Sequence, residues 1–212
     1  MNKIDLAPLS RYLLSFARPQ TTQTKVILVR NAESQGNLAG TITGWMDCPL
    51  TDFGRKQAFK LSGILANTRV NSVFSSDLRR SVDTTFYGMA FESENITHTP
   101  LLREINFGVH EGLHFDNLPD SEKARFADPD FQAVEGESWK DVRKRTQGFM
   151  KKLNKGTHMC FTHGGLITTY LQEHGLSEMP PNCSVLGVEV GADGLAEKLE
   201  FFWEFPYVEE DI

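Results

Sequence analysis

The sequence has few cysteines and no excess of basic residues. Its three cysteines, Cys48, Cys160 and Cys183, are odd in number and lack the spacing of a Cys-x-x-Cys motif or a zinc site. We therefore expect packed thiols in a reducing compartment, with no disulfide, no metal site and no cofactor. The 28 acidic residues outnumber the 22 lysines and arginines, giving a formal net charge of −6. This balance argues against a nucleic-acid or anionic-membrane partner.

Long apolar runs and linkers are missing as well. No stretch approaches the roughly 20 apolar residues that a membrane helix needs, so we expect no membrane span. The chain also lacks repeats and low-complexity tracts. Of its 212 residues, 40% are hydrophobic, which is enough for one sizeable core. We expect one α/β domain over residues 25–212, preceded by an extension over residues 1–24.

The N-terminal extension has an amphipathic, acid-poor pattern. Its apolar side chains share one helical face, and Pro19 is expected to end the helix near Arg18. Such a segment is typical of a mitochondrial transit peptide. It is also compatible with a helix that docks on a protein partner or on the body of the domain through residues 1–18, or with a cytosolic extension of no special role. Cytoplasm and mitochondrion both stay open as compartments. The apolar face consists of Leu6, Leu9, Leu13, Phe16 and Ala17.

Short apolar runs alternate with helical patterns through the rest of the chain. We expect strands at residues 26–29, 71–76, 158–162, 185–190 and 199–203. We expect helices at residues 54–66, 78–89, 138–153 and 166–174, the third capped by Ser138 and the last followed by Gly175. This alternation predicts a mostly parallel sheet between two helical layers, a three-layer α/β/α sandwich. The polar section 112–137 is expected to form a short helical lid, and residues 209–211 an acidic tail.

Polar loops follow three of the predicted strands. In open α/β sheets, ligands bind beyond the carboxyl ends of the strands, where such loops converge. The loops carry Arg30, Arg80 and His163, and we expect these side chains to approach one point. Two forked guanidiniums beside an imidazole fit a tetrahedral phosphoryl group better than a flat carboxylate.

Six ordered motifs give the chain a family resemblance. They are VRNAESQGN (29–37), GWMDCPLTDFGRKQA (44–58), SSDLRRSVDT (75–84), LREINFGVHEG (102–112), GES (136–138) and FTHGG (161–165). From about Lys25 onward the chain resembles the histidine phosphatase superfamily, in the branch of cofactor-dependent phosphoglycerate mutases and small phosphatases. The resemblance implies a phosphoglycerate mutase-like fold. The short lid resembles that of the small phosphatases more than the longer insertion of the mutases.

The resemblance also implies roles for individual residues. The family's phosphate-binding positions fall on Arg30, Asn37, Arg80 and His163, and its general acid falls on Glu104. These positions imply a site for phosphate or a small phosphomonoester.

The family's nucleophilic histidine falls on Asn31, and the glycine that follows it falls on Ala32. A carboxamide offers hydrogen-bond donors and an acceptor but no nucleophile near neutral pH. We therefore expect a catalytically dead or crippled pseudoenzyme that binds a phospho-ligand or serves as a structural subunit, for example of a mitochondrial assembly. The alternative is a weakly active phosphomonoesterase in which water attacks directly, assisted by Glu104 and His163. Because Ala32 departs from the family pattern as well, natural divergence explains the pair better than a deliberate single substitution.

Two further alternatives concern the pocket itself. It collapses if Arg30 and Arg80 form internal salt bridges with Glu33 and Glu104, but we favour anion binding because burying the positive cluster without an anion is costly. His110 or His163 is a candidate to replace the nucleophile. Alanine at the family's glycine position is expected to add strain of about 1 kcal/mol if that position needs an unusual φ.

Overall fold

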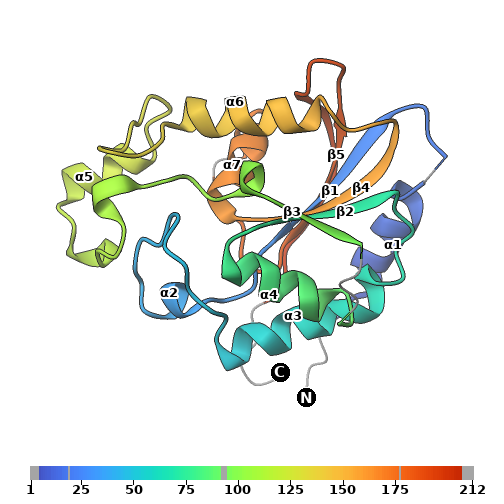
Figure 1. Cartoon of the computed structure of the whole chain (residues 1–212), viewed down its shortest axis with the longest axis horizontal. Coiled ribbons are helices and arrows are strands. Elements are labelled where there is room, and N and C mark those ends of the chain that lie inside the picture. The colour runs from blue at the N-terminus through green and yellow to red at the C-terminus, as the bar shows by residue number, and fades with distance from the viewer. Residues whose placement is uncertain (1–4, 19, 92–94, 177, 207–212) are drawn as a thin grey trace.

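A six-stranded sheet lies between two layers of helices (Figure 1). The computed structural model describes residues 5–18, 20–91, 95–176 and 178–206. The strands are β1 (Thr24–Arg30), β2 (Ser72–Ser76), β3 (Ile96–Thr99), β4 (Gly156–Thr162), β5 (Val185–Val190) and β6 (Ala196–Trp203). The α-helices are α1 (Ala7–Phe16), α2 (Gln35–Leu38), α3 (Asp52–Leu65), α4 (Arg79–Gly88), α5 (Asp120–Phe126), α6 (Trp139–Met150) and α7 (Gly164–Gln172). Short 3₁₀ turns are η1 (Pro100–Leu102), η2 (Gly108–His110) and η3 (Phe115–Asn117).

The sheet is mixed, with strand order β3-β2-β4-β1-β5-β6. The pairs β3–β2, β2–β4 and β4–β1 are parallel, whereas β5 pairs antiparallel with both β1 and β6. The short connection between β5 and β6 contains Gly194 at φ +83° and permits only a hairpin, which explains the antiparallel edge. The predicted three-layer α/β architecture is confirmed.

The two faces of β1 enter two separate hydrophobic cores. Ile27 and Val29 pack on the side covered by α3, whereas Val26 and Leu28 pack on the side covered by α6 and α7. Figure 1 shows α3 and α4 on one side of the sheet and α6 and α7 on the other. Side chains alternate across a strand, so a continuous apolar run is buried on both faces.

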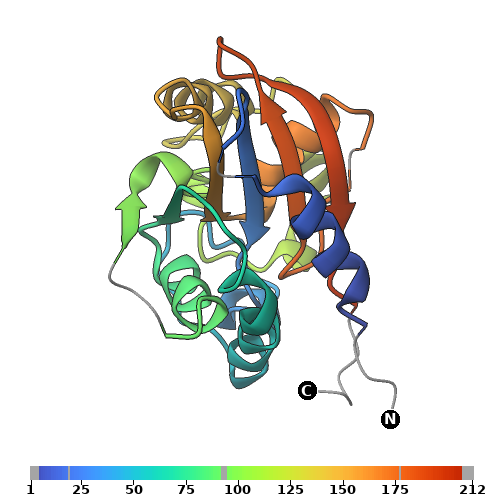
Figure 2. The same cartoon turned by 90° about the vertical axis from the view of Figure 1, so that its right-hand side faces the viewer.

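Helix α1 packs on the body of the domain. Leu9, Leu13 and Phe16 are buried in the core on the α3 side of the sheet. The ring of Phe201 in β6 stacks on Tyr12, with centroids 5.3 Å apart, and meets Phe16 edge-on. Figure 2 shows α1 crossing the face of β5 and β6. The helix ends at Phe16, with Ala17 as its C-cap, which agrees with the expected end near Arg18; Pro19 and the acidic residues 209–211 lie outside the described residues.

Some helix and strand boundaries in the structure differ from those predicted, and local interactions explain the differences. The Thr51 hydroxyl accepts a hydrogen bond from the Gly54 amide, so α3 begins at Asp52 instead of Gly54. Ser138 caps α6 as predicted, in a reciprocal capping box with Asp141. Strand β3 was not predicted, because Ile96–Thr99 has no apolar run. None of the described helices combines the length and apolar character needed to cross a membrane.

The packing of α1 generates a stability prediction. Leu13 is 2% exposed and Leu14 is 78% exposed on the same helix. Leu13→Ala should lower the free energy of unfolding by about 2–5 kcal/mol because it leaves a cavity in the core. Leu14→Ala, the matched control, should change it by less than about 0.5 kcal/mol. Urea unfolding of both variants is the measurement, and equal losses would show that α1 does not pack as described.

Candidate functional site

Three loops converge at one edge of the parallel strands. Arg30 pairs with Thr162 at the ends of β1 and β4, and Ser75 near the end of β2 pairs with Phe161. The carboxyl ends of these strands therefore lie side by side, and the residues that follow each strand share one site. Arg30, Arg80 and His163, together with Asn31, gather there as the spacing of the motifs predicts.

A buried chain of hydrogen bonds joins Asn31 to His163 and Ser76. Asn31 Oδ1 lies 3.1 Å from His163 Nδ1, and the Ser76 hydroxyl lies 2.8 Å from His163 Nε2. Because Oδ1 can only accept, Nδ1 carries the proton and Nε2 accepts from Ser76. The Leu78 amide donates to Ser76 Oγ, and Asn31 Nδ2 donates to the Ala32 carbonyl at 2.9 Å. Every polar atom of the His163 ring and the Asn31 carboxamide thus has a partner.

The imidazole of His163 is neutral in this setting. Its ring is fully buried, and burial lowers the pKa of His163 well below its usual value. The nearby positive charges of Arg80, Arg145 and Arg30 lower that pKa further. The Asn31 carboxamide is therefore hydrogen-bonded to a neutral imidazole.

Both arginines donate to main-chain carbonyls. Arg80 donates to the carbonyls of Gly44 and Met46 at 2.7 and 3.0 Å, and Arg30 Nη1 donates to the carbonyl of Pro180. Arg30 Nε is buried and has no hydrogen-bond partner within the described residues. Burial lowers the pKa of Arg30 to about 10, although the Glu104 carboxylate opposes the shift. Arg30 is therefore a cation with an unused, desolvated donor.

The salt bridges of the collapsed alternative do not form. Glu33 Oε1 accepts from the Thr51 hydroxyl at 2.7 Å. Glu104 Oε1 accepts from the Ile105 amide and Oε2 from the Gly165 amide at the start of α7, both at 2.9 Å. Glu104 thus acts as a hydrogen-bond acceptor that fixes the start of α7, and the idea that either carboxylate neutralises an arginine by direct pairing is wrong.

Asn37 and Ala32 complete the first loop. Asn37 Oδ1 accepts from Ser34 in the capping box of α2, while its amide nitrogen has no partner within the described residues. Ala32 donates its amide to Thr84 Oγ1 at 2.9 Å. Its φ is not positive, in contrast to those of Ala90 and Phe91. The strain expected at Ala32 from a left-handed backbone is therefore absent.

A cavity of about 540 Å³ opens above this cluster. Arg30, Asn37 and Glu104 line it, whereas Asn31, Arg80 and His163 are buried and are not among its lining residues. Helix α5 contributes Lys123 and Phe126 to the wall, so part of the 112–137 section forms a helical rim, as expected for a lid. His110 does not line the cavity. Its Nε2 is hydrogen-bonded to Glu122 within the lid, at a distance of 2.8 Å. His110 is therefore poorly placed to replace a nucleophile.

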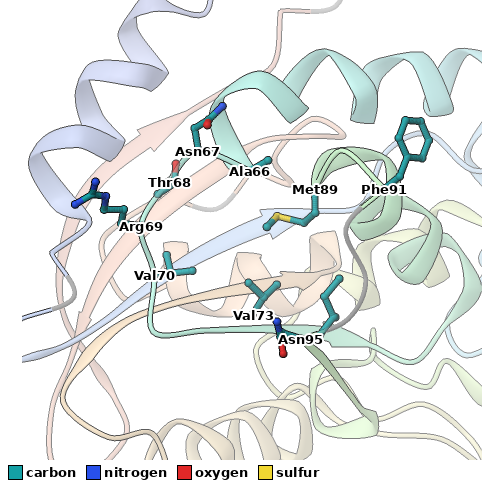
Figure 3. A pocket seen from close by; sticks show the side chains of 10 residues that line it. Ala66, Asn67, Thr68, Arg69, Val70, Val73, Met89, Phe91 and Asn95 are labelled. Carbon is teal, nitrogen blue, oxygen red and sulfur yellow. The ribbon is translucent and has the colours of Figure 1, made fainter.

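A cavity of about 730 Å³ lies elsewhere, beside the start of β2 and β3 (Figure 3). Arg69 is the one charged residue among the described residues that line it, and Val70, Val73 and Met89 form an apolar part of its wall. It contains none of the predicted site residues. Because ligands of this architecture bind at the opposite ends of the strands, we do not assign the site here.

Some supporting residues escaped the sequence analysis. Ser76 belongs to the SSDLRRS motif and follows an apolar run, so its place beside His163 could have been anticipated. Arg145 was not singled out, yet it donates to the Glu104 carbonyl at 2.8 Å and pairs with Glu137 at 2.8 Å. The contact of Arg30 with the Pro180 carbonyl could not be predicted from the sequence, because every residue type has a main-chain carbonyl. Among the described residues, no three His, Cys, Asp or Glu side chains lie close enough to hold a metal ion.

Comparisons with known proteins agree on one family. A model described as "Histidine phosphatase superfamily (branch 1)" matches residues 26–198. Phosphoserine phosphatase 1 of Hydrogenobacter thermophilus is 27% identical over 188 residues, covering 85% of this chain and 81% of that protein. A probable phosphoglycerate mutase GpmB of an Enterobacter species is 30% identical over 181 residues, covering 78% and 84%.

Solved structures give the same picture. A phosphoglycerate mutase from Thermus thermophilus is 33% identical with a TM-score of 0.68, covering 77% of this chain and 92% of its own. A mycobacterial glucosyl-3-phosphoglycerate phosphatase is 22% identical with a TM-score of 0.73, covering 86% and 99%, and shares the fold. The predicted phosphoglycerate mutase-like fold is thereby confirmed.

The buried, neutral His163 predicts a pH dependence of stability. In the unfolded chain the His163 imidazole is protonated below about pH 6.5, whereas in the folded protein it stays neutral. The contribution of His163 to the free energy of unfolding is therefore fully present above about pH 6.5 and is lost as the pH is lowered. His163→Gln should remove up to about 1.4 kcal/mol per pH unit of this slope. Urea unfolding of both proteins between about pH 7 and pH 5 measures it. Parallel curves, or imidazole proton signals of folded His163 that titrate in this range, would contradict the assignment.

Proposed function

The chain belongs to the histidine phosphatase superfamily, and from that premise we propose that it binds phosphate or a small phosphomonoester without turning it over. It is in this proposal a pseudoenzyme with a retained anion site. The observation that carries it is Asn31, which the family resemblance assigns to the position of the nucleophilic histidine. The lone pair of a carboxamide nitrogen is delocalised into the carbonyl group, so this nitrogen cannot attack phosphorus.

The hydrogen bonds of Asn31 support the loss of covalent chemistry. The side chain is 3% exposed, and both of its polar atoms are occupied by His163 and the Ala32 carbonyl. Asn31 thus contributes to the structure of the loop. In enzymes whose nucleophile was removed, positioning and charge stabilisation left a rate about 10³- to 10⁴-fold above that of the uncatalysed reaction in water. This is far below normal turnover.

The unused donor of Arg30 supports anion binding. Arg30 lines the cavity, its Nε has no hydrogen-bond partner among the described residues, and a phosphate beside the guanidinium would offset the cost of burying its charge. Asn37 lines the same cavity with an amide nitrogen that has no partner among the described residues, and the buried Arg80 adds positive charge close to Arg30. This arrangement suits a dianion that enters from the cavity.

The alternative of direct water attack has less support. Both ring nitrogens of His163 are occupied and the ring has no exposed surface. Both carboxylate oxygens of Glu104 accept backbone amides. Neither group is therefore free to activate water or to protonate a leaving oxygen in this arrangement.

A role as a structural subunit, in the mitochondrion or elsewhere, would use residues 1–18. The buried face of α1 is already covered by β5 and β6, so this segment stabilises the domain itself. A partner would have to use the outer face, where Leu14 is exposed.

Phosphate binding is tested by ligand-dependent stability. Inorganic phosphate at 100 times its Kd should raise the free energy of unfolding of the wild type by about 2.7 kcal/mol, compared with chloride at equal ionic strength. Arg30→Met should abolish this gain, because it removes the unused donor and the charge. Arg79→Met, on the exposed neighbour of Arg80, is the matched control and should keep it. A wild type that phosphate does not stabilise would refute the anion site.

Loss of turnover is tested by restoring the imidazole. With a generic aryl phosphate, the wild type should remain at the background rate, while Asn31→His should exceed it by orders of magnitude because a nucleophile returns to an otherwise retained site. Adding Arg30→Met to Asn31→His should abolish the gain. Steady-state release of inorganic phosphate is the readout, and a wild-type rate equal to that of Asn31→His would sink the pseudoenzyme proposal.

A further inference from the structure

The wall of the cavity beyond Arg30 is made of aromatic rings. Phe107, Phe115 and Phe126 line it together with Trp139 at the start of α6. Ring centroids are 5.3 Å apart for Phe107 and Phe126, 6.0 Å for Phe115 and Phe126, and 6.3 Å for Phe107 and Trp139. The four side chains thus form one continuous aromatic wall on one side of the cavity.

The aromatic wall keeps accessible surface. None of its four rings is fully buried, although three of them border the core on the α6 and α7 side of the sheet. Exposed aromatic surface inside a concave cavity is costly in water and favourable against an apolar ligand. The wall is therefore suited to contact an apolar group of a bound molecule.

Hydrogen bonds hold the aromatic wall in place. Trp139 Nε1 donates to the Phe126 carbonyl at 3.1 Å, which joins α6 to the end of α5. Lys123 Nζ donates to the Asp116 carbonyl at 2.9 Å, and His110 holds Glu122. These contacts fix α5 from several directions, so the wall exists before any ligand arrives and little ordering entropy is lost on binding.

The charges of the cavity do not favour a small polar ester. A phosphoserine or phosphoglycerate brings a carboxylate in addition to its phosphate. Arg30 and Lys123 are the cations among the described lining residues, and the Lys123 ammonium also lies 3.7 Å from Asp120 Oδ1. Lys123 is the one further cation for that carboxylate among these residues, and its ammonium already donates to the Asp116 carbonyl; a cavity of about 540 Å³ also exceeds the size of such ligands.

From these observations we infer that the ligand is a phosphomonoester whose alcohol part carries a planar aromatic ring. The phosphate lies at Arg30 and Asn37, and the ring packs on the aromatic wall of Phe107, Phe126 and Trp139. Offset or edge-on ring pairs contribute about 0.5–1.5 kcal/mol each beyond the burial of their area. The inference rests on the proposed phosphate binding, and it adds the class of ligand that the site selects.

The test compares probes of graded chemistry on the full-length wild type by calorimetry. They are inorganic phosphate, phosphoserine, cyclohexyl phosphate, phenyl phosphate and 1-naphthyl phosphate. We expect 1-naphthyl phosphate to bind about tenfold more tightly than inorganic phosphate, since the corresponding ~1.4 kcal/mol lies within the range that two ring contacts supply. Phosphoserine should bind no more tightly than inorganic phosphate, and phenyl phosphate should bind more tightly than cyclohexyl phosphate.

A matched pair of variants locates the preference. Phe126→Leu should reduce the ratio of the Kd for inorganic phosphate to the Kd for 1-naphthyl phosphate by about threefold to tenfold. Phe86→Leu, at an exposed ring on α4 that does not line the cavity, should leave this ratio at the wild-type value.

The possible failures are distinguishable. If inorganic phosphate itself does not bind, the proposed function and this inference both fall. If phosphate binds but 1-naphthyl phosphate is not tighter, or phosphoserine is tighter than both, the inference alone is overturned. Equal affinity for cyclohexyl and phenyl phosphate would overturn the aromatic selectivity, and an unchanged ratio in Phe126→Leu would overturn the assignment of the ring site.

Discussion

The contact between the Asn31 carboxamide and the His163 imidazole determines the character of the site. It joins two neutral, buried groups at a place where Arg30 and Arg80 supply positive charge. Because burial and the nearby arginines lower the pKa of His163, the imidazole is neutral, adds no charge of its own and does not repel the arginines. The positive charge around the ring therefore comes from the arginines, of which Arg30 lines the cavity.

This contact depends on the order of the strands. Strands β2, β4 and β1 are neighbours in the sheet and run parallel, so their carboxyl ends bring residues 31, 76 and 163 into one hydrogen-bonded chain. A second set of bonds holds the loop that carries Glu104. The main-chain carbonyl of Glu104 accepts hydrogen bonds from Trp45 Nε1 at 2.7 Å and from Arg145, and the Glu104 carboxylate accepts one from the Gly165 amide. The loop is thereby held by Trp45, by Arg145 and by the start of α7, which fixes the place of Glu104 in the cavity wall.

Much of this could be predicted from the sequence, and the exceptions have physical reasons. The run VILV predicted a strand buried on both faces, and the motifs after β1, β2 and β4 predicted which side chains meet. Strand β3 was missed because a half-exposed edge strand needs no apolar run. The less favoured alternative, in which Arg30 and Arg80 pair with Glu33 and Glu104, is not what the structure shows. Main-chain carbonyls, here those of Gly44, Met46 and Pro180, serve instead, and their positions depend on the loop backbone, which no residue type reports.

The central claim is that phosphate esters reach this cavity and leave it without forming a bond to the protein. Mass spectrometry of the intact wild type, quenched with acid-free denaturant during incubation with 1-naphthyl phosphate, tests it most directly. We predict the unmodified mass at every time point, in a sample whose bound ester is measured in parallel by equilibrium dialysis. A protein species heavier by one phosphoryl group would contradict the claim, whichever side chain carried it.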